Sequence, residues 1–298
     1  MMKFHLELIP ANGHIQPYEI PYGYTFQTVI FGWLHEHNPK LYHKLHTYEE
    51  VRPYSINCYI HKDEPKVDFT IVASNQALAS TLLEVVIPKK GTAITVARKK
   101  YIVEGVDVES IILETMLKQS KPVKRFHLQF ATPCYFNTLK GNYPIRFPLP
   151  DALFGNLLNI WKAMSASTFT SRKKQFLSWI KAHIYPSSYK MRSASYFIAR
   201  ENQVAGGQGF VSFWINSPDD YYYQHKLKKD TLTAREKTEC RQNHFQNSQL
   251  IDFLCKVGEY TNVGGHRTAG MGVVRYFPKE YCQPEDSETL AEPLLPIT

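Results

Sequence analysis

The sequence predicts an α+β fold of two tandem ferredoxin-like domains, and three observations lead to this class. The first is the order of periodic segments in the first half of the chain. Alternating apolar residues predict strands at residues 3–9, 54–60, 66–73, 92–97 and 101–108. Apolar residues at helical spacing, or a capping residue ahead of them, predict helices at residues 25–36, 39–46 and 75–85. The resulting order of β-α-β-β-α-β is that of a ferredoxin-like domain.

The second observation is that a similar order begins again after a connection at residues 110–124. Strands are predicted at residues 126–131, 188–199, 209–215 and 273–276, and helices at residues 151–161, 172–183 and 248–257. Residues 217–247 show little apolar periodicity and are interpreted as a polar insertion, and the acidic tail from Pro284 onward is expected to fray. We therefore predict one domain at residues 1–120 and a second, elaborated domain at residues 121–298.

The third observation is composition. The 298 residues are 43% hydrophobic, which suits one large or two ordinary domains. Lysine and arginine outnumber acidic residues 35 to 27, giving a net charge of +8 that favours a polyanionic partner. The five cysteines form no CxxC pair, and no apolar run approaches membrane-spanning length. A cytoplasmic protein with neither a zinc ribbon nor a disulfide framework is the simplest interpretation.

A glycine-rich stretch near the end of the chain is the strongest local motif. It contains Gly264, Gly265, Gly270 and Gly272, with His266 and Arg267 between the two pairs. Glycines permit left-handed backbone and close approach, and successive N–H groups can bind an anion. The glycines lead into a strand and not a helix, which argues against a nucleotide-cofactor loop. The alternatives are a phosphate-binding loop and an ordinary turn before the last strand.

Together these motifs resemble the CRISPR-associated endoribonucleases that cut repeat RNA into guide RNAs, the Cas-six family. The resemblance covers most of the chain. It rests on Pro21-Tyr-Gly-Tyr24, the segment from Asn38 to His46, Ala131-Thr-Pro133, the helix opening at Pro148 to Leu158, and the glycine loop. The resemblance implies two RNA-recognition-motif-like domains and metal-independent RNA cleavage without a cofactor.

Cleavage of this kind uses the RNA's own 2′-hydroxyl as nucleophile and needs proton transfer and stabilisation of phosphate charge. By the resemblance, His46 occupies the family's catalytic position. Arg52 falls where several relatives carry a catalytic lysine, and because arginine stays protonated we assign it to charge stabilisation. Phe31 falls where some relatives carry a tyrosine, so the missing group would come from His43, Tyr48 or the RNA itself. His43 and His46 share a helix face, but no third metal ligand is evident nearby, and no metal site is predicted.

Basic clusters are the candidates for binding the RNA backbone. They are Lys89 with Lys90, Arg98 with Lys99 and Lys100, Lys121 with Lys124 and Arg125, Arg172 with Lys173 and Lys174, and Lys190 with Arg192. To these we add the glycine loop, with Arg267 expected to contact phosphate. The tyrosines at 221–223 are either a stacking surface or part of a loop.

The favoured function is a repeat-specific endoribonuclease that leaves a 2′,3′-cyclic phosphate and a 5′-hydroxyl. The alternative is a non-catalytic subunit that holds repeat RNA in a CRISPR effector complex, which Phe31 and Arg52 make credible. A two-domain protein with an unrelated metabolic ligand is a third reading. The expected partner is CRISPR repeat RNA, no membrane partner is expected, and homodimer formation is left open.

Overall fold

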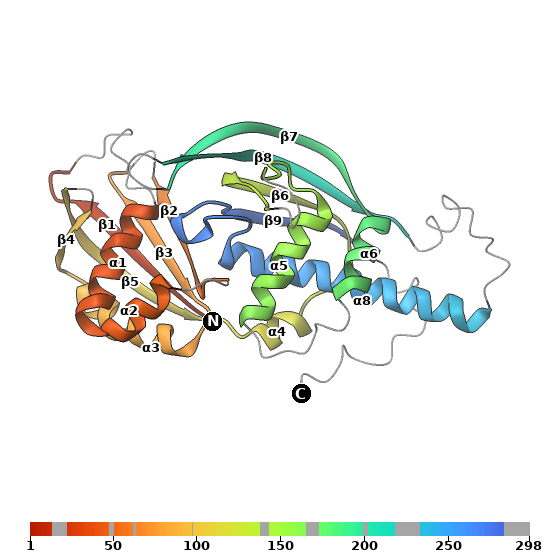
Figure 1. Cartoon of the computed structure of the whole chain (residues 1–298), viewed down its shortest axis with the longest axis horizontal. Coiled ribbons are helices and arrows are strands. Elements are labelled where there is room, and N and C mark those ends of the chain that lie inside the picture. Colours follow the sequence, from red (N-terminus) through yellow and green to blue (C-terminus); the bar gives the residue numbers. More distant parts are fainter. Residues whose placement is uncertain are drawn as a thin grey trace.

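The structure is a computed structural model that describes residues 1–13, 23–47, 51–61, 64–96, 98–137, 143–164, 173–198, 202–217 and 233–282. These residues form two antiparallel sheets accompanied by helices, which confirms the predicted α+β class of tandem ferredoxin-like domains. The two sheets lie side by side along the long axis of the molecule (Figure 1). Within the described ranges, no helix is long and apolar enough to cross a lipid bilayer.

The first sheet has the strand order β2-β3-β1-β5-β4. Its strands are β1 (Met2–Pro10), β2 (Tyr54–Ile60), β3 (Val67–Ala73), β4 (Ala93–Val96) and β5 (Lys99–Ser110). Its helices are α1 (Gly23–His37), α2 (Pro39–His46), α3 (Gln76–Val86) and the 3₁₀ turn η2 (Ile87–Lys89). The side chains of Asn38 and Asn75 cap α2 and α3 by accepting backbone N–H groups of the first turn. The short strand β4 adds one edge strand to the four that the ferredoxin-like order requires.

The second sheet repeats this arrangement with the order β7-β8-β6-β9. Its strands are β6 (Val123–Cys134), β7 (Ile184–Phe197), β8 (Gln203–Ile215) and β9 (Val274–Tyr281). The accompanying helices are α5 (Pro150–Met164), α6 (Lys173–His183), α8 (Ala234–Thr261) and the 3₁₀ turn η5 (Arg267–Ala269). Strands β7 and β8 form a long hairpin that curves along the outer edge of the sheet (Figure 1).

The first half of α8 differs from the prediction. Residues 233–247 were expected to belong to a polar insertion, which is wrong, because α8 starts at Ala234 and continues for 28 residues. Thr233 and Glu236 form a capping box that satisfies the first N–H groups of the helix. This end of the helix is exposed and polar, so it lacks the apolar stripe by which helices are recognised. The tyrosines at 221–223 and the tail from residue 283 lie outside the described residues.

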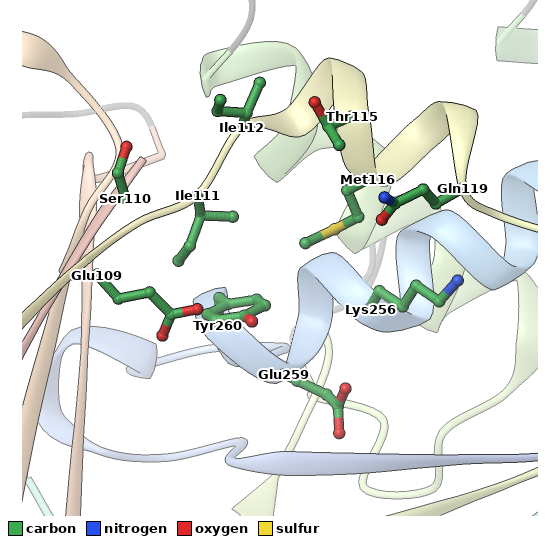
Figure 2. A pocket seen from close by; sticks show the side chains of 10 residues that line it. All are labelled: Glu109, Ser110, Ile111, Ile112, Thr115, Met116, Gln119, Lys256, Glu259 and Tyr260. Carbon is green, nitrogen blue, oxygen red and sulfur yellow. The ribbon is translucent and has the colours of Figure 1, made fainter.

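The linker between the domains carries α4 (Leu113–Lys118), which packs against α8. A cavity of about 390 Å³ opens at this junction. Figure 2 shows its lining, which combines apolar side chains from the linker with charged side chains from β5 and α8. None of the lining residues belongs to the site predicted from the sequence. The domain division at residues 120 and 121 falls in this linker and stays a prediction.

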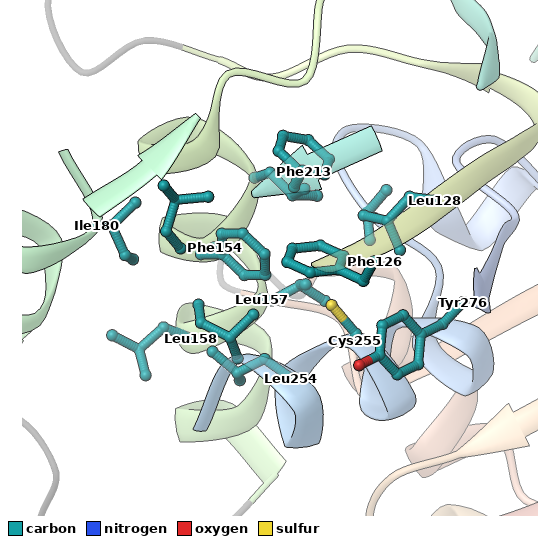
Figure 3. Close-up of a cluster of buried hydrophobic side chains, with 14 of the residues drawn as sticks. Phe126, Leu128, Phe154, Leu157, Leu158, Ile180, Phe213, Leu254, Cys255 and Tyr276 are labelled. Carbon is teal, nitrogen blue, oxygen red and sulfur yellow. The ribbon is translucent and has the colours of Figure 1, made fainter. Parts of the chain in front are cut away.

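Each domain has its own hydrophobic core. In the second domain the rings of Phe126 and Phe213 stack, with centroids 5.2 Å apart, and Phe154 from α5 contacts both edge-on (Figure 3). In the first domain Phe26 of α1 stacks on Phe69 of β3 at 4.3 Å. These contacts fix one helical layer against each sheet.

A buried histidine pair between α6 and α8 makes the second domain sensitive to acid. His244 accepts a 3.4 Å hydrogen bond from the Trp179 indole, and its ring lies 5.0 Å from that of His183. Burial, followed by the neighbouring His183, lowers the pKa of His244 to about 3. The folded protein therefore holds this ring neutral, whereas the unfolded chain protonates it as the pH falls below about 6.5.

We expect this difference to reduce the free energy of unfolding between pH 6.5 and pH 3, by at most about 1.4 kcal/mol per pH unit. His244→Gln keeps an acceptor for the indole but cannot titrate. Urea denaturation at pH 7 and pH 5 should show a smaller loss for the variant than for the wild-type chain. Equal losses in the two proteins would show that other groups control acid stability.

Candidate active site

His46 ends the short helix α2, which Asn38 and Pro39 begin. Its imidazole is exposed and lies edge-on to two rings, with centroid distances of 4.5 Å to Tyr42 and 5.1 Å to Phe31. Leu45 is buried beneath it and fixes the helix against the domain. His46 is therefore presented to solvent on a rigid element. His43 lies one turn earlier and is also exposed, whereas Tyr48 lies outside the described residues.

Arg52 lies at the junction between the two domains, where its backbone carbonyl accepts a hydrogen bond from Arg267 of the glycine loop. The pKa of His46 is lowered by partial desolvation of the ring, and then by the positive charges of Arg52 and His43. The pKa of His266 in the glycine loop is lowered by desolvation and then by the same Arg52. The hydrogen bond joins the segment that carries Arg52 to the glycine loop, and the charge of Arg52 contributes to the lowered pKa of a histidine in each domain.

Two buried aromatic residues, Tyr54 and Phe31, pack against each other, and Phe31 also packs against His46. Tyr54 is 1% exposed, and its hydroxyl accepts a 2.7 Å hydrogen bond from Gln27 of α1. Desolvation raises the pKa of Tyr54, although Arg52 opposes the shift. Phe31 lies against Tyr54 at 5.6 Å and offers His46 only a hydrocarbon edge. Phe31 therefore offers no hydroxyl to His46, as expected from the sequence.

The glycine loop is packed tightly against its own domain. Gly264 and Gly272 have φ values of +77° and +69°, and a Cβ on either would collide with the backbone of Tyr135 or Val263. The four loop glycines donate their N–H groups inside the protein, to acceptors on Asn156, Tyr135, Arg267 and Pro133. These hydrogen bonds occupy the N–H groups that were expected to bind an anion, and they pack the glycines closely against neighbouring backbone. The RNA contact expected of the glycine loop stays a prediction.

Arg267 also points inward, whereas the sequence suggested that it faces a phosphate. It is 8% exposed, and its guanidinium donates to the carbonyl of Thr261 at 3.1 Å and to the carbonyl of Arg52. Burial lowers its pKa to about 10, so it remains charged at neutral pH. The RNA contact expected of Arg267 stays a prediction, and in this conformation the side chain ties the loop to the segment that carries Arg52.

Two further side chains, Asn262 and Ser55, complete this junction between the domains. Asn262 is fully buried and donates from Nδ2 to the carbonyls of Ile56, at 2.9 Å, and Arg267, at 3.1 Å. The hydroxyl of Ser55 donates to the carbonyl of Tyr260 at 2.7 Å. Strand β2 is thus held to the end of α8 and to the loop. No local sequence pattern indicates the hydrogen bonds of Asn262 to Ile56 and of Ser55 to Tyr260, because their partners are 206 and 205 residues apart.

The predicted basic clusters are distributed over both domains. Lys89 and Lys90 lie before the edge strand β4, and Arg98, Lys99 and Lys100 lie at the turn into β5. Lys89 places its ammonium over the Trp33 ring at 5.1 Å. In the second domain Lys173 donates to Asn159 at 2.7 Å, and Arg192 donates to Gln208 at 3.1 Å. Lys190 is exposed on β7, and Arg172 lies outside the described residues. The roles of all these basic clusters in RNA binding stay predictions.

An exposed aromatic surface on the second sheet was not predicted from the sequence. The face of the second sheet turned away from its core carries the exposed aromatic residues Tyr185, Phe210, Trp214 and Phe277. Trp214 lies beneath the guanidinium of Arg125, 5.3 Å from its ring centroid. The alternation of residues 210–215 predicted a strand, but aromatic residues occur on both of its faces, so the sequence could not show which ones remain exposed.

A comparison with known families gives a match at residues 128–274, to the family described as CRISPR-associated endoribonuclease Cas6. No curated protein matches the chain by sequence. The matched residues run from β6 to the start of β9 and include the glycine loop.

Solved structures are similar over nearly the whole chain. A Cas6 product complex is 15% identical with a TM-score of 0.72, and covers 93% of this chain and 99% of its own. A second Cas6 product complex is 16% identical with a TM-score of 0.67 and the same coverage. A Thermus thermophilus Cas6 is 14% identical with a TM-score of 0.62, and covers 93% of this chain and 98% of its own. At these identities the likeness shows the fold.

Proposed function

We propose that this chain, whose residues 128–274 match the family of CRISPR-associated endoribonuclease Cas6, cuts CRISPR repeat RNA at a site formed by His46 and Arg52. The observation that carries the proposal is the hydrogen bond from Arg267 of the glycine loop to the carbonyl of Arg52, which joins the two domains beside the candidate catalytic segment. The lowered pKa values of His46 and His266, to which the charge of Arg52 contributes in both cases, support it. Similar folds occur in Cas6 proteins solved as product complexes, which is consistent with RNA as the ligand.

The proposed reaction begins at the 2′-hydroxyl of the RNA. A lowered pKa keeps His46 neutral near pH 7, so that its ring can accept the 2′-hydroxyl proton. The oxygen then attacks the adjacent phosphorus, and the P–O bond to the 5′-oxygen breaks. Arg52 stabilises the phosphate charge, and His43 or His266 supplies the proton to the leaving oxygen. The products are a 2′,3′-cyclic phosphate and a 5′-hydroxyl, and neither metal nor cofactor takes part.

RNA binding is proposed to use the basic clusters and the aromatic face of the second sheet. Lysine and arginine side chains contact the phosphate backbone, so affinity should fall as salt rises. Exposed Phe210, Trp214 and Phe277 offer flat rings on which unpaired bases can stack. Lys190 and Arg125 lie beside these rings in the strand register, which places cations next to the stacking surface.

The direct test is incubation of the chain with its repeat RNA in EDTA, followed by analysis of the product ends. Cleavage with a cyclic phosphate and a 5′-hydroxyl supports the proposal. Cleavage that requires a divalent metal would contradict it. Tight binding without any product would favour the alternative of a non-catalytic subunit that holds repeat RNA, and this alternative is favoured by the absence of a hydroxyl at Phe31.

The pH dependence of cleavage should report on Arg52. Because the pKa of His46 is lowered, the rising limb of the pH profile should have a midpoint below 6.5, and the rate should fall again at higher pH as the histidine that donates the proton becomes neutral. Arg52→Gln removes the nearby charge, so the midpoint of the rising limb should move upward and the maximal rate should fall by about 10²- to 10³-fold. Arg52→Lys retains a charge and should keep the midpoint closer to that of the wild-type chain. Single-turnover rates from pH 5 to pH 9 measure both effects, and an unchanged midpoint in Arg52→Gln would exclude this coupling.

A further inference from the structure

A second cluster of reactive side chains lies on the first sheet, away from the residues assigned to cleavage. His5 and Glu7 are two residues apart on β1, so both side chains leave the same face, while Phe4, Leu6 and Leu8 fill the core on the other. Asp68 of β3 is directly opposite Glu7 in the strand register. The cluster therefore forms on neighbouring strands at the middle of the sheet.

The donor atoms of this cluster converge. One ring nitrogen of His5 and one carboxylate oxygen each of Glu7 and Asp68 lie within 4.8 Å of one another. His61, just beyond β2, approaches the other oxygen of Asp68 with its Nε2 at 2.7 Å. Nε2 of His5 and Oδ1 of Asp68 face each other at 3.4 Å, both are shielded from solvent, and neither has a hydrogen-bond partner of good geometry. When His5 is neutral with a lone pair on Nε2, these two atoms are both electron-pair donors, an arrangement that suits a bridging cation.

The surroundings favour a positive ion. Asp107 of β5 lies opposite His5 in the register, which adds a third carboxylate to the face. The nearby cation is Lys66, whose ammonium is 2.8 Å from Glu7 and 4.0 Å from Asp68. Gly105 lies opposite Glu7, and a Cβ there would come within 3.1 Å of the carboxylate, so the glycine leaves room for Glu7 to lie across the sheet.

We propose that His5, Glu7 and Asp68 form a site for a divalent transition metal such as Zn²⁺, with water as the fourth ligand and His61 positioning Asp68 through the other carboxylate oxygen. Imidazole and carboxylate together suit Zn²⁺ and its neighbours, whereas Mg²⁺ takes oxygen ligands almost exclusively. Binding moves the ammonium of Lys66 away from Glu7 and joins β1 and β3 through one ion. The site stabilises the first domain and takes no part in cleavage, so it does not depend on the proposed function.

The test uses the full chain, free of metal and without an affinity tag. Co²⁺ is titrated and followed by visible absorption, and Zn²⁺ is then added to displace it. We expect one Co²⁺ per chain with the spectrum of a tetrahedral site, replaced by Zn²⁺, and a higher unfolding temperature with either ion. His5→Gln and Asp68→Asn should each weaken binding at least tenfold.

Two further variants separate this site from nonspecific binding. His37→Ala removes an exposed histidine that pairs with a single carboxylate, Glu84, at 2.6 Å, and it should leave the spectrum unchanged. Lys66→Met removes the competing ammonium and should tighten binding. The proposal is overturned if the wild-type chain binds no ion with this spectrum, if His5→Gln binds as well as wild type, or if Lys66→Met weakens binding.

Discussion

Replacing His46 with alanine is expected to slow single-turnover cleavage of the repeat RNA by about 10²- to 10⁴-fold, the usual contribution of one positioned acid–base group. The ring is exposed at the end of α2 and forms no hydrogen bond within the part of the chain that the structure describes, so its loss should leave the fold intact. RNA affinity should change by less than about threefold, because a neutral side chain contributes little to phosphate binding.

His37→Ala is the matched control for this experiment. His37 is an exposed histidine at the end of α1 that pairs with Glu84, and its removal should leave the cleavage rate unchanged. Rates are compared at saturating enzyme, so that affinity does not enter. A His46→Ala protein that cuts as fast as wild type would remove this residue from the mechanism.

Replacing Arg267 with alanine is expected to reduce both stability and the chemical step. The substitution leaves the buried carbonyls of Thr261 and Arg52 without their donor, at a cost of about 1–3 kcal/mol in the free energy of unfolding. It also releases the segment that positions Arg52, so the single-turnover rate should fall by at least about tenfold. Urea denaturation and cleavage at saturating enzyme, measured on the same preparation, give the two values.

Arg275→Ala is the control, because Arg275 is an exposed arginine in the same domain and its loss removes one charge without opening the junction. The two roles considered for Arg267 predict different results. If Arg267 holds the two domains together, its loss lowers the cleavage rate at saturating enzyme. If Arg267 binds phosphate, its loss lowers only the affinity for RNA. Weakened binding with a normal saturated rate and normal stability would support the contact that the glycine-rich sequence suggested.

The fold was predictable because its signals are local. Alternating apolar residues at 3–9 and 66–73 face one core, and the stripe containing Phe26, Ile30 and Leu34 faces the same core from α1. The order of these segments is sufficient to define a ferredoxin-like domain. The first half of α8 escaped prediction because it is exposed, so only its capping box at Thr233 marks it as a helix.

The glycine loop shows that a local sequence motif does not determine which way its N–H groups and side chains point. Four glycines in nine residues predict a special backbone, and Gly264 and Gly272 indeed adopt left-handed angles. Whether the N–H groups face outward or inward depends on Pro133, Tyr135 and Asn156, which are more than 100 residues earlier in the chain. The inward orientation of Arg267 has the same origin, since its acceptor on Arg52 belongs to the other domain.

The candidate site was predictable in part. His46 and Arg52 were chosen by resemblance, and their catalytic roles stay predictions. Desolvation and then the charge of Arg52 lower the pKa of His46 and also that of His266, which the sequence had assigned to binding. The cluster of His5, Glu7 and Asp68 was not predicted, because its ligands come from separate strands and match no metal-binding spacing.

The central claim is that the RNA's own 2′-hydroxyl is the nucleophile at the His46 site. The most direct measurement uses a repeat RNA with a single 2′-deoxy substitution at the nucleotide before the cut, in EDTA and at saturating enzyme. The account predicts that this RNA binds like the unmodified repeat and is not cleaved, while a 2′-deoxy substitution one nucleotide away is cleaved normally. Cleavage of the modified RNA at the same phosphate would show that water or a protein group attacks instead, and would contradict the account.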